Sequence, residues 1–504
     1  MSSLHAKQVG YTQPSLKTRQ DAMRPAPSAS SPTSPTSSRK QKFKITLRPD
    51  QLPTELDKFP APLILPDDDL ALDPEYPAQS FQDWVDEEER NAVTARRRTV
   101  YVLGPPGVDG DDDSLSLDVD AWTRPRMTDS ASASDIAFPE TKDVVEYLSA
   151  FYHGLPVKQL DLPNWQFTAW EEPAPAPTKR ATKAKRQKTS AKTEPIGLIT
   201  ATECIRIRTR PCPDGLYTTQ LNLDDLLDAA ISILPKDAYA LCMLVHHDLF
   251  EDDDDTFVCG RAYGGSRVAV VSTARYHPGL DGVAGIERGH AWPAAHCADY
   301  IEGVCRGVDG VSKRRKKSIS VFKGQSQTRE DGDGPLEAAL AAYIATTTEQ
   351  EPTPEPPLWL WRISRTVSHE LGHCFGIDHC VYYACIMQGS ASLAEDTRQP
   401  PYLCPVDLAK VLAATGASVA ERDKALLKFC EREESRGEQG FRAFAAWMRV
   451  SLRLQGLGAA GGADGEVDGQ EDVAGVRKNE NKTDGSRSGL ITESWQRLWD
   501  DLDE

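Results

Sequence analysis

The sequence has little that belongs to a membrane or a secreted protein. No stretch of this 504-residue chain approaches the roughly 20 consecutive apolar residues that a transmembrane helix needs. Its opening, MSSLHAKQVGYTQPSLK, lacks the apolar core of a secretory signal. These absences predict an intracellular protein, cytoplasmic or nuclear or both, that is not secreted and has no membrane partner.

The chain also lacks the excess of positive charge that nucleic-acid binding requires. It has 58 Lys and Arg against 76 Asp and Glu, which gives a net charge of −18. A phosphate backbone repels such a surface unless basic side chains gather on one face, so we expect no nucleic-acid partner. Apolar residues make up only 39% of the chain and prolines number 35, which predicts one sizeable folded domain with long disordered arms.

Composition divides the chain into three parts. Residues 1–95 contain runs such as SASSPTSPTSS and FPAPLILPDDDLALDPEYP, whose small apolar content predicts a disordered arm. A folded domain is predicted over residues 96–455, with low-complexity inserts near 171–194 and 307–335. Residues 456–504 predict a disordered acidic tail with a short terminal amphipathic helix, ITESWQRLWDDLDE. That helix could dock on a partner or back on its own domain.

Strand and helix patterns alternate within the domain. The run DAYALCMLVHHDL is continuously apolar, as in a strand buried on both faces, and CGRAYGGSRVAVVSTARY has the pattern of a hairpin. Helical spacing appears in TKDVVEYLSAFYHGL, in LNLDDLLDAAISIL and over residues 358–375, and again in several segments after residue 404. The pattern predicts an α/β fold with a mixed twisted sheet, followed by a C-terminal helical subdomain.

Histidine is scarce, yet three of the ten histidines stand in the single run HELGHCFGIDH. His369 and His373 are four residues apart, so a helix would place both imidazoles on one face, one turn apart. Glu370 could then reach a water held by a bound ion and act as general base. Gly376 allows the helix to end through a left-handed residue, after which the chain can return with His379.

Three neutral imidazoles leave one tetrahedral position open for water, which is the arrangement of a catalytic zinc and not of a structural one. Zinc suits such a site best among the divalent metals. Met387, in the turn-like CIMQGS, would form an apolar floor beneath the histidines. The helix carrying HExxH is therefore predicted to be an active-site helix.

The cysteines predict a second metal site. Eleven cysteines in an intracellular protein indicate metal ligands before disulfides, and Cys380, Cys385 and Cys404 converge from one connected stretch. A closed tetrahedral site needs a fourth ligand, and Asp407 stands where the second cysteine of a CxxC pair would be. Asp407 could be that ligand or the N-cap of the helix LAKVLAAT, and both readings stay open. Cys374 is predicted to point away from the catalytic ion into the core.

The order HExxHxxGxxHC, then CxM, then a cysteine–proline pair, resembles the archaemetzincins, metzincin-related zinc metallopeptidases with a second zinc on four cysteines. The stretches FYHGL, LPKDAYALCMLVHHDL, GRAYGGSRVAVVSTARY, ACIMQGS and ERDKALLKF support the likeness, which covers roughly residues 96–435 outside the inserts. The resemblance implies an α+β zincin-like fold.

The resemblance also implies roles for single residues. It assigns the catalytic zinc to His369, His373 and His379, the role of general base and acid to Glu370, and the Met-turn to Met387. It assigns the second zinc to Cys380, Cys385 and Cys404, while Asp407 departs from the family's fourth cysteine.

The leading functional hypothesis is therefore a zinc-dependent metallopeptidase that acts on a peptide or protein substrate. The alternative is a zinc-stabilised binding or regulatory protein with little or no proteolytic activity. We expect the strand within residues 267–276 to be the sheet edge along which an extended substrate lies. Many metzincins have a tyrosine two residues after the turn methionine, whereas this chain has Gly389 there. We expect His246 and His247, after the buried strand, to be turn residues without a ligand role.

Overall fold

The protein is described here by a computed structural model, which covers residues 11–24, 47–52, 59–108, 119–126, 136–170, 194–296, 334–348, 355–434 and 436–456. The two predicted inserts lie almost entirely outside the described residues. The predicted tail beyond residue 456, with its terminal helix, lies outside them as well. Within the described ranges, no helix combines the length and the apolar character needed to cross a membrane.

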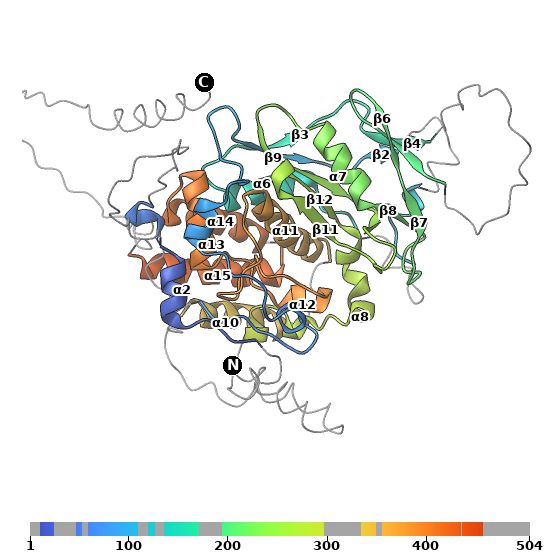
Figure 1. The fold of residues 1–504 in the computed structure, drawn as a ribbon. Helices are drawn as coiled ribbons and strands as arrows, with labels where there is room; N and C mark the ends of the chain where they lie inside the picture. Colours follow the sequence, from blue (N-terminus) through green and yellow to red (C-terminus); the bar gives the residue numbers. More distant parts are fainter. Residues whose placement is uncertain are drawn as a thin grey trace, which may run out of the picture.

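The centre of the fold is a five-stranded mixed sheet (Figure 1). Its strands are β1 (Thr99–Leu103), β3 (Val157–Leu160), β9 (Ala238–Val245), β11 (Gly260–Tyr263) and β12 (Val268–Ser272). The spatial order is β11-β12-β9-β1-β3, and all neighbouring strands are parallel except β11, which runs antiparallel to β12. The predicted mixed sheet and the predicted hairpin are confirmed.

Helices cover both faces of this sheet. Helix α7 (Leu223–Ser232) packs on one face, while α6 (Thr141–Phe151) and α11 (Glu355–Cys374) pack on the other. Along β9, Leu241 and Met243 belong to the core on the α7 side, and Ala240 and Cys242 belong to the core on the α11 side. The continuous apolar run of β9 follows from this burial on both faces.

Two smaller sheets flank the central one. The first has the order β10-β8-β7 and the second β2-β4-β5-β6. Their strands are β2 (Gly107–Val108), β4 (Gln166–Ala169), β5 (Ile196–Ile199), β6 (Cys204–Ile207), β7 (Thr209–Pro211), β8 (Thr219–Asn222) and β10 (Asp248–Phe250). The short helical turn η4 (Gly264–Ser266) connects the two strands of the hairpin. Further short turns follow the hairpin: η5 (Ala274–Tyr276), η6 (Pro278–Leu280), α8 (Asp281–Ala284), η7 (Arg288–His290) and η8 (Ala294–His296).

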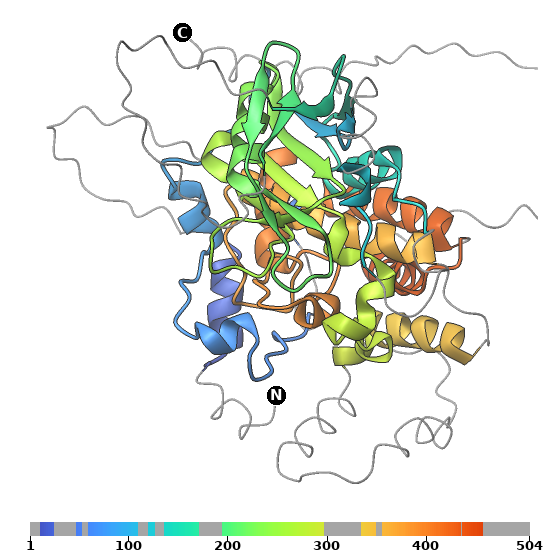
Figure 2. The same cartoon turned by 90° about the vertical axis from the view of Figure 1, so that its right-hand side faces the viewer.

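The chain after residue 404 is helical, as predicted, and two helices before it, α10 (Pro335–Thr348) and α12 (Leu393–Arg398), were not predicted. Besides these two and α11, the described helices after residue 334 are α13 (Pro405–Thr415), α14 (Val419–Glu434) and α15 (Gln439–Leu454). Helix α15 packs on α10 and α14, and α14 packs on α6. The view in Figure 2 shows these helices beside and below the strands.

The described part of the N-terminal arm differs from the predicted disorder. It contains α2 (Leu16–Ala22), η1 (Pro49–Gln51), α3 (Asp69–Leu72) and α4 (Phe81–Asp86). We call residues 59–95 the N-terminal strap. Phe81 and Trp84 of this strap are 0% and 1% exposed and belong to the main core. Composition averaged over the whole arm concealed these two aromatic side chains, which supply the apolar burial that orders the segment.

The strap is expected to contribute to stability through Trp84. The indole Nε1 donates to the Phe375 carbonyl at 2.8 Å, and the Arg90 guanidinium lies 4.1 Å from the ring centroid. Trp84→Ala should lower the free energy of unfolding by about 3–5 kcal/mol. Urea unfolding at fixed zinc concentration measures this, and Leu72→Ala, at a side chain that is 66% exposed, is the control. An unchanged midpoint for Trp84→Ala would contradict the packing.

Candidate metal centres

Helix α11 presents His369 and His373 on one face. Their Nδ1 atoms lie 2.7 Å from the carbonyl oxygens of Ile386 and Ile377, respectively. Because a carbonyl can only accept, each Nδ1 carries the proton and each Nε2 keeps its lone pair for a metal. The two Nε2 atoms lie 3.1 Å apart.

The chain turns back at Gly376, which has a φ of +74°. The Gly376 N–H donates to the His373 carbonyl at 2.9 Å, and the Ile377 N–H donates to the Gly372 carbonyl at 3.1 Å, so the helix ends here in a glycine C-cap. The loop that follows brings His379 to the other two histidines, and the ligand atoms of all three lie within 4.8 Å of one another. Tetrahedral zinc with ordinary Zn–N bonds separates its nitrogens by roughly 3.3 Å, so the three imidazoles fit one ion.

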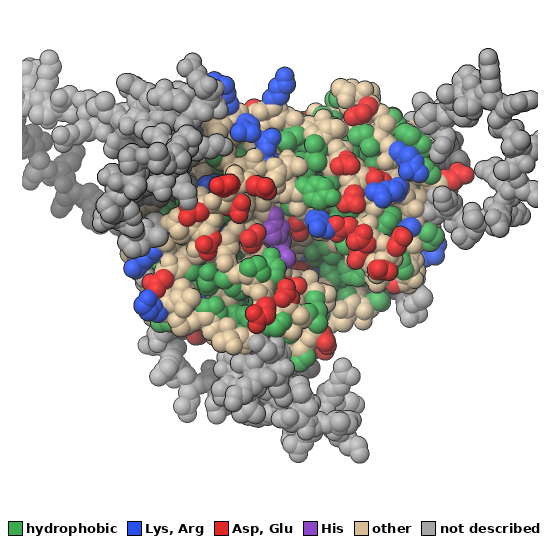
Figure 3. Space-filling view, in the orientation of Figure 1, with side chains coloured by type: hydrophobic (Ala, Val, Ile, Leu, Met, Phe, Trp, Pro, Cys, Tyr) green, Lys and Arg blue, Asp and Glu red, His purple; other side chains and the backbone are tan. Residues whose placement is uncertain are grey.

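The histidines are partly exposed and in the form that binds metal. Burial lowers the pKa of His369 well below its usual range, and burial also lowers the pKa of His373 and that of His379, the latter to about 4. Neutral imidazoles are the ligands that zinc needs. Figure 3 shows histidine side chains at the surface near the middle of one face, with acidic side chains around them.

Met387 lies beneath the histidine helix. A Cβ placed on Gly372 would overlap the Met387 sulfur, so the thioether packs directly against α11 between the two histidines. Met387 is 0% exposed, and its carbonyl accepts from the Cys380 N–H at 2.7 Å. Glycine at 372 is therefore required for this approach of helix and turn.

Glu370 is 9% exposed and follows the first histidine on α11. Burial raises the pKa of Glu370 to about 8, and the positive charge of Arg261 on β11 opposes this rise. A carboxyl group with a pKa near neutrality can both accept and release a proton at working pH.

The strand at the edge of the sheet is β11 and not the strand within residues 267–276. The expectation for that strand was wrong, because β12 pairs with β11 on one side and with β9 on the other. The first strand of the hairpin therefore takes the outer position. A Cβ on Gly264, at the end of β11, would lie 2.5 Å from the His373 carbonyl oxygen, so the edge strand meets the histidine helix directly.

The sulfur-rich group is fully buried. Cys380, Cys385, Cys404 and Asp407 place their ligand atoms within 4.8 Å of one another. The Sγ atoms of Cys380 and Cys404 lie 3.5 Å apart, and the Asp407 Oδ2 lies 3.3 Å from the Cys385 Sγ and 3.4 Å from the Cys404 Sγ. Tetrahedral zinc requires roughly 3.8 Å between two thiolates and roughly 3.5 Å between a thiolate and a carboxylate oxygen, so these four residues also fit one ion.

The alternative that Asp407 caps a helix is wrong. Cys404 is the N-cap of α13, and its sulfur accepts from the Asp407 backbone N–H at 3.5 Å. The Asp407 carboxylate directs Oδ2 to the thiols and receives Lys410 Nζ at 2.9 Å on Oδ1. Burial and the charge of Cys380 raise the pKa of Asp407 to about 7, while Lys410 opposes the rise.

Several other candidates lie apart from both groups. Cys374 is 1% exposed and lies in the core, where Tyr239 donates its hydroxyl to the Cys374 carbonyl at 3.3 Å. His246 and His247 sit at the bend after β9: His246 stacks on Phe138 with ring centroids 3.8 Å apart, and His247 is buried. Neither histidine belongs to the two metal-binding groups found among the described residues.

Sequence reasoning missed the contacts that the strap makes at the site. The ring of Tyr76 lies 5.5 Å from the His379 ring, and a Cβ on Gly389 would overlap a carboxylate oxygen of Asp69. The strap therefore fills the space next to position 389. It also contributes Gln79, which contacts Lys410. Of these contacting residues, only Lys410 could have been found from local sequence, because its position three residues after Asp407 on one helix predicts an ion pair between them.

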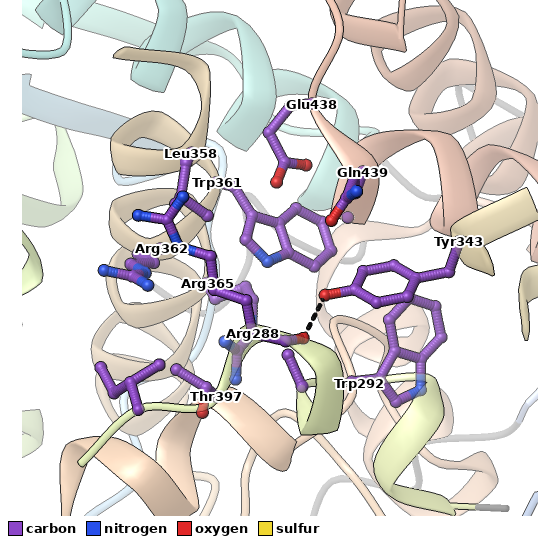
Figure 4. A pocket seen from close by; sticks show the side chains of 13 residues that line it. Arg288, Trp292, Tyr343, Leu358, Trp361, Arg362, Arg365, Thr397, Glu438 and Gln439 are labelled. Carbon is purple, nitrogen blue, oxygen red and sulfur yellow. Dashed lines mark hydrogen bonds between the residues drawn. The ribbon is translucent and has the colours of Figure 1, made fainter. Parts of the chain in front are cut away.

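A separate pocket lies between α10, α11 and α15 (Figure 4). Its walls include Trp361 and Arg365 of α11, and Tyr343 of α10 donates its hydroxyl to the Arg288 carbonyl at 2.6 Å across it. None of the residues of the two metal-binding groups line this pocket, so it is not the candidate active site.

The chain is similar to several proteins of one peptidase family. The family model for peptidase family M54 matches residues 339–411. Archaemetzincin-2 of Macaca fascicularis is 25% identical over 378 residues, which cover 75% of this chain and 75% of that protein. An archaemetzincin of Methanopyrus kandleri is 45% identical over 51 residues, or 10% of this chain and 29% of that protein. The crystal structure of archaemetzincin from Methanopyrus kandleri aligns with 64% of this chain and 98% of its own, at 16% identity and a TM-score of 0.27.

Proposed function

This chain belongs to the archaemetzincin family, a family of zinc metallopeptidases, and we propose that it hydrolyses peptide bonds of peptide or protein substrates. One observation carries the proposal. Three neutral, partly exposed imidazoles converge on one point, with a buried glutamate beside them on the same helix. Such a set leaves a coordination position open for catalysis.

The proposed metal ligands form two sets. His369, His373 and His379 would hold a catalytic zinc, above the floor made by Met387 and after the turn at Gly376. Cys380, Cys385, Cys404 and Asp407 would hold a second, structural zinc. When bound, the catalytic zinc supplies a water of lowered pKa and polarises the substrate carbonyl.

The side chains of the protein would carry the remaining steps. The Glu370 carboxylate would accept the proton of the attacking water and return it to the leaving amine. Among the described residues β11 is the outermost strand of the central sheet, and it lies beside α11. Its outer side would hold an extended substrate by backbone hydrogen bonds.

The alternative is a zinc-stabilised binding protein without useful catalysis. The presence of Glu370 beside all three histidines argues against it, because loss of the general base is the usual mark of an inactive relative.

The test is hydrolysis of a fluorogenic peptide library by the full chain with measured zinc content. We expect turnover that disappears when a chelator removes zinc and returns when zinc is restored. A fully zinc-loaded protein that cleaves no peptide of the library would support the binding protein instead.

A further inference from the structure

The loop that carries His379 is held by a side chain of the N-terminal strap. Gln79 Nε2 donates to the Gly376 carbonyl at 3.0 Å and to the Asp378 carboxylate at 3.1 Å. Gln79 Oε1 accepts from the Asp378 backbone N–H at 3.2 Å. One amide thus fixes the backbone between the end of α11 and the third histidine.

The same amide contacts Lys410, which is 1% exposed. Lys410 Nζ donates to the Gln79 carbonyl at 2.9 Å, to Gln79 Oε1 at 2.8 Å and to Asp407 Oδ1 at 2.9 Å. A buried ammonium is costly unless it is paired and hydrogen-bonded, so these three acceptors fix its position. Asp407 in turn directs its other oxygen to the cysteines.

A continuous series of hydrogen bonds therefore joins the two candidate metal centres. It runs from the sulfur-rich group through Asp407, Lys410 and Gln79 to the loop before His379. The three histidines differ in what supports them: His369 and His373 stand on a helix, whereas His379 stands on a loop. Ligands on loops depend on their supporting contacts for precise placement.

We propose that Gln79 and Lys410 are positioning residues that transmit order from the second metal centre to His379, so that filling the second centre raises the zinc affinity of the first. This inference rests on the proposed function, because it requires that the three histidines bind metal. Residues that support a metal ligand in this way typically change metal affinity by about 10- to 100-fold when they are replaced.

The first experiment replaces Gln79 by its isostere in the full-length protein loaded with cobalt. Gln79→Glu keeps the volume and an acceptor for Lys410, but it loses both N–H donations and places a charge beside Asp378. Thiolate-to-cobalt charge transfer reports the second centre, and the remaining cobalt absorption reports the first. We expect the Kd of the first centre to rise by about 10-fold or more with the thiolate signal unchanged. Gln82→Glu is the control for the same change of side chain on the same strap, and the amide of Gln82 donates to Asp86 at 2.9 Å.

The second experiment tests transmission through Lys410. Lys410→Met keeps most of the buried stem and removes the ammonium, and Lys424→Met, at an exposed position of α14, is its control. We expect Lys410→Met also to weaken metal binding by the histidines. Gln79→Glu should weaken metal binding by the histidines less in the Lys410→Met variant than in the wild type. The two effects are not additive because both residues act in one series of hydrogen bonds.

The outcomes separate this inference from the proposed function. Two filled centres with unchanged affinity in both variants overturn the inference alone. Equal weakening of the two centres, or the same effect from Gln82→Glu, indicates general loosening and also overturns it. A wild-type protein that takes up only thiolate-bound cobalt rejects the proposed catalytic centre, and with it this inference.

Discussion

Glu370→Gln is expected to lower peptide hydrolysis by roughly 10²- to 10⁴-fold while the zinc content stays the same. Glutamine fills the space of the carboxylate but cannot take a proton from water. The loss should appear in kcat, because the substitution removes a proton transfer and not a binding contact. The measurement is kcat and KM on a peptide selected from the library, at equal zinc content.

The matched control is Glu337→Gln, an exposed glutamate on α10. We expect its activity to equal that of the wild type. Equal rates for the wild type and Glu370→Gln would contradict the proposed peptidase activity. The measured hydrolysis would then come from a contaminating enzyme or from a non-enzymatic reaction.

Asp407→Ala is expected to reduce the zinc content from about two ions per chain to about one. The second centre would lose its only oxygen ligand, and Lys410 would lose the carboxylate that balances its charge. Structural zinc contributes directly to folding, so the melting temperature should fall as well. Elemental analysis and thermal unfolding of the same samples measure both effects.

Asp407→Cys provides the matched rescue. A fourth thiolate at this position restores the all-cysteine set of the archaemetzincin pattern, so we expect two zinc ions per chain and a stronger thiolate-to-cobalt band than in the wild type. A wild-type zinc content near one, unchanged by Asp407→Ala, would remove the second centre from the proposal.

The parts of the site that sequence could predict are those set by local spacing. An i, i+4 pair on a helix fixes the relation of His369 to His373, and a glycine three residues later fixes where that helix ends. The position of Asp407 was also encoded locally: Pro405 favours the first position of a helix, which makes Cys404 the N-cap and moves Asp407 inside the helix.

The parts that sequence could not predict depend on contacts between distant segments. Gln79 meets Gly376 across a separation of 297 residues, and no periodicity near residue 79 indicates such a partner. The order of the two hairpin strands was equally undetermined, because either strand could pair with β9 until the tertiary fold selected β12. Composition predicted disorder for the strap because it averages a few buried aromatic residues over many prolines and acidic residues.

The contacts of the strap determine where a truncated fragment of the protein can begin. A fragment that starts at residue 96 would retain every proposed zinc ligand and the proposed base, yet it would lack Trp84 from its interior and Gln79 from beside the third histidine. The smallest fragment worth expressing therefore starts no later than residue 59. A cellular protease that removed this segment would leave the HExxH motif intact in the sequence but would remove the hydrogen bonds that hold the loop before His379.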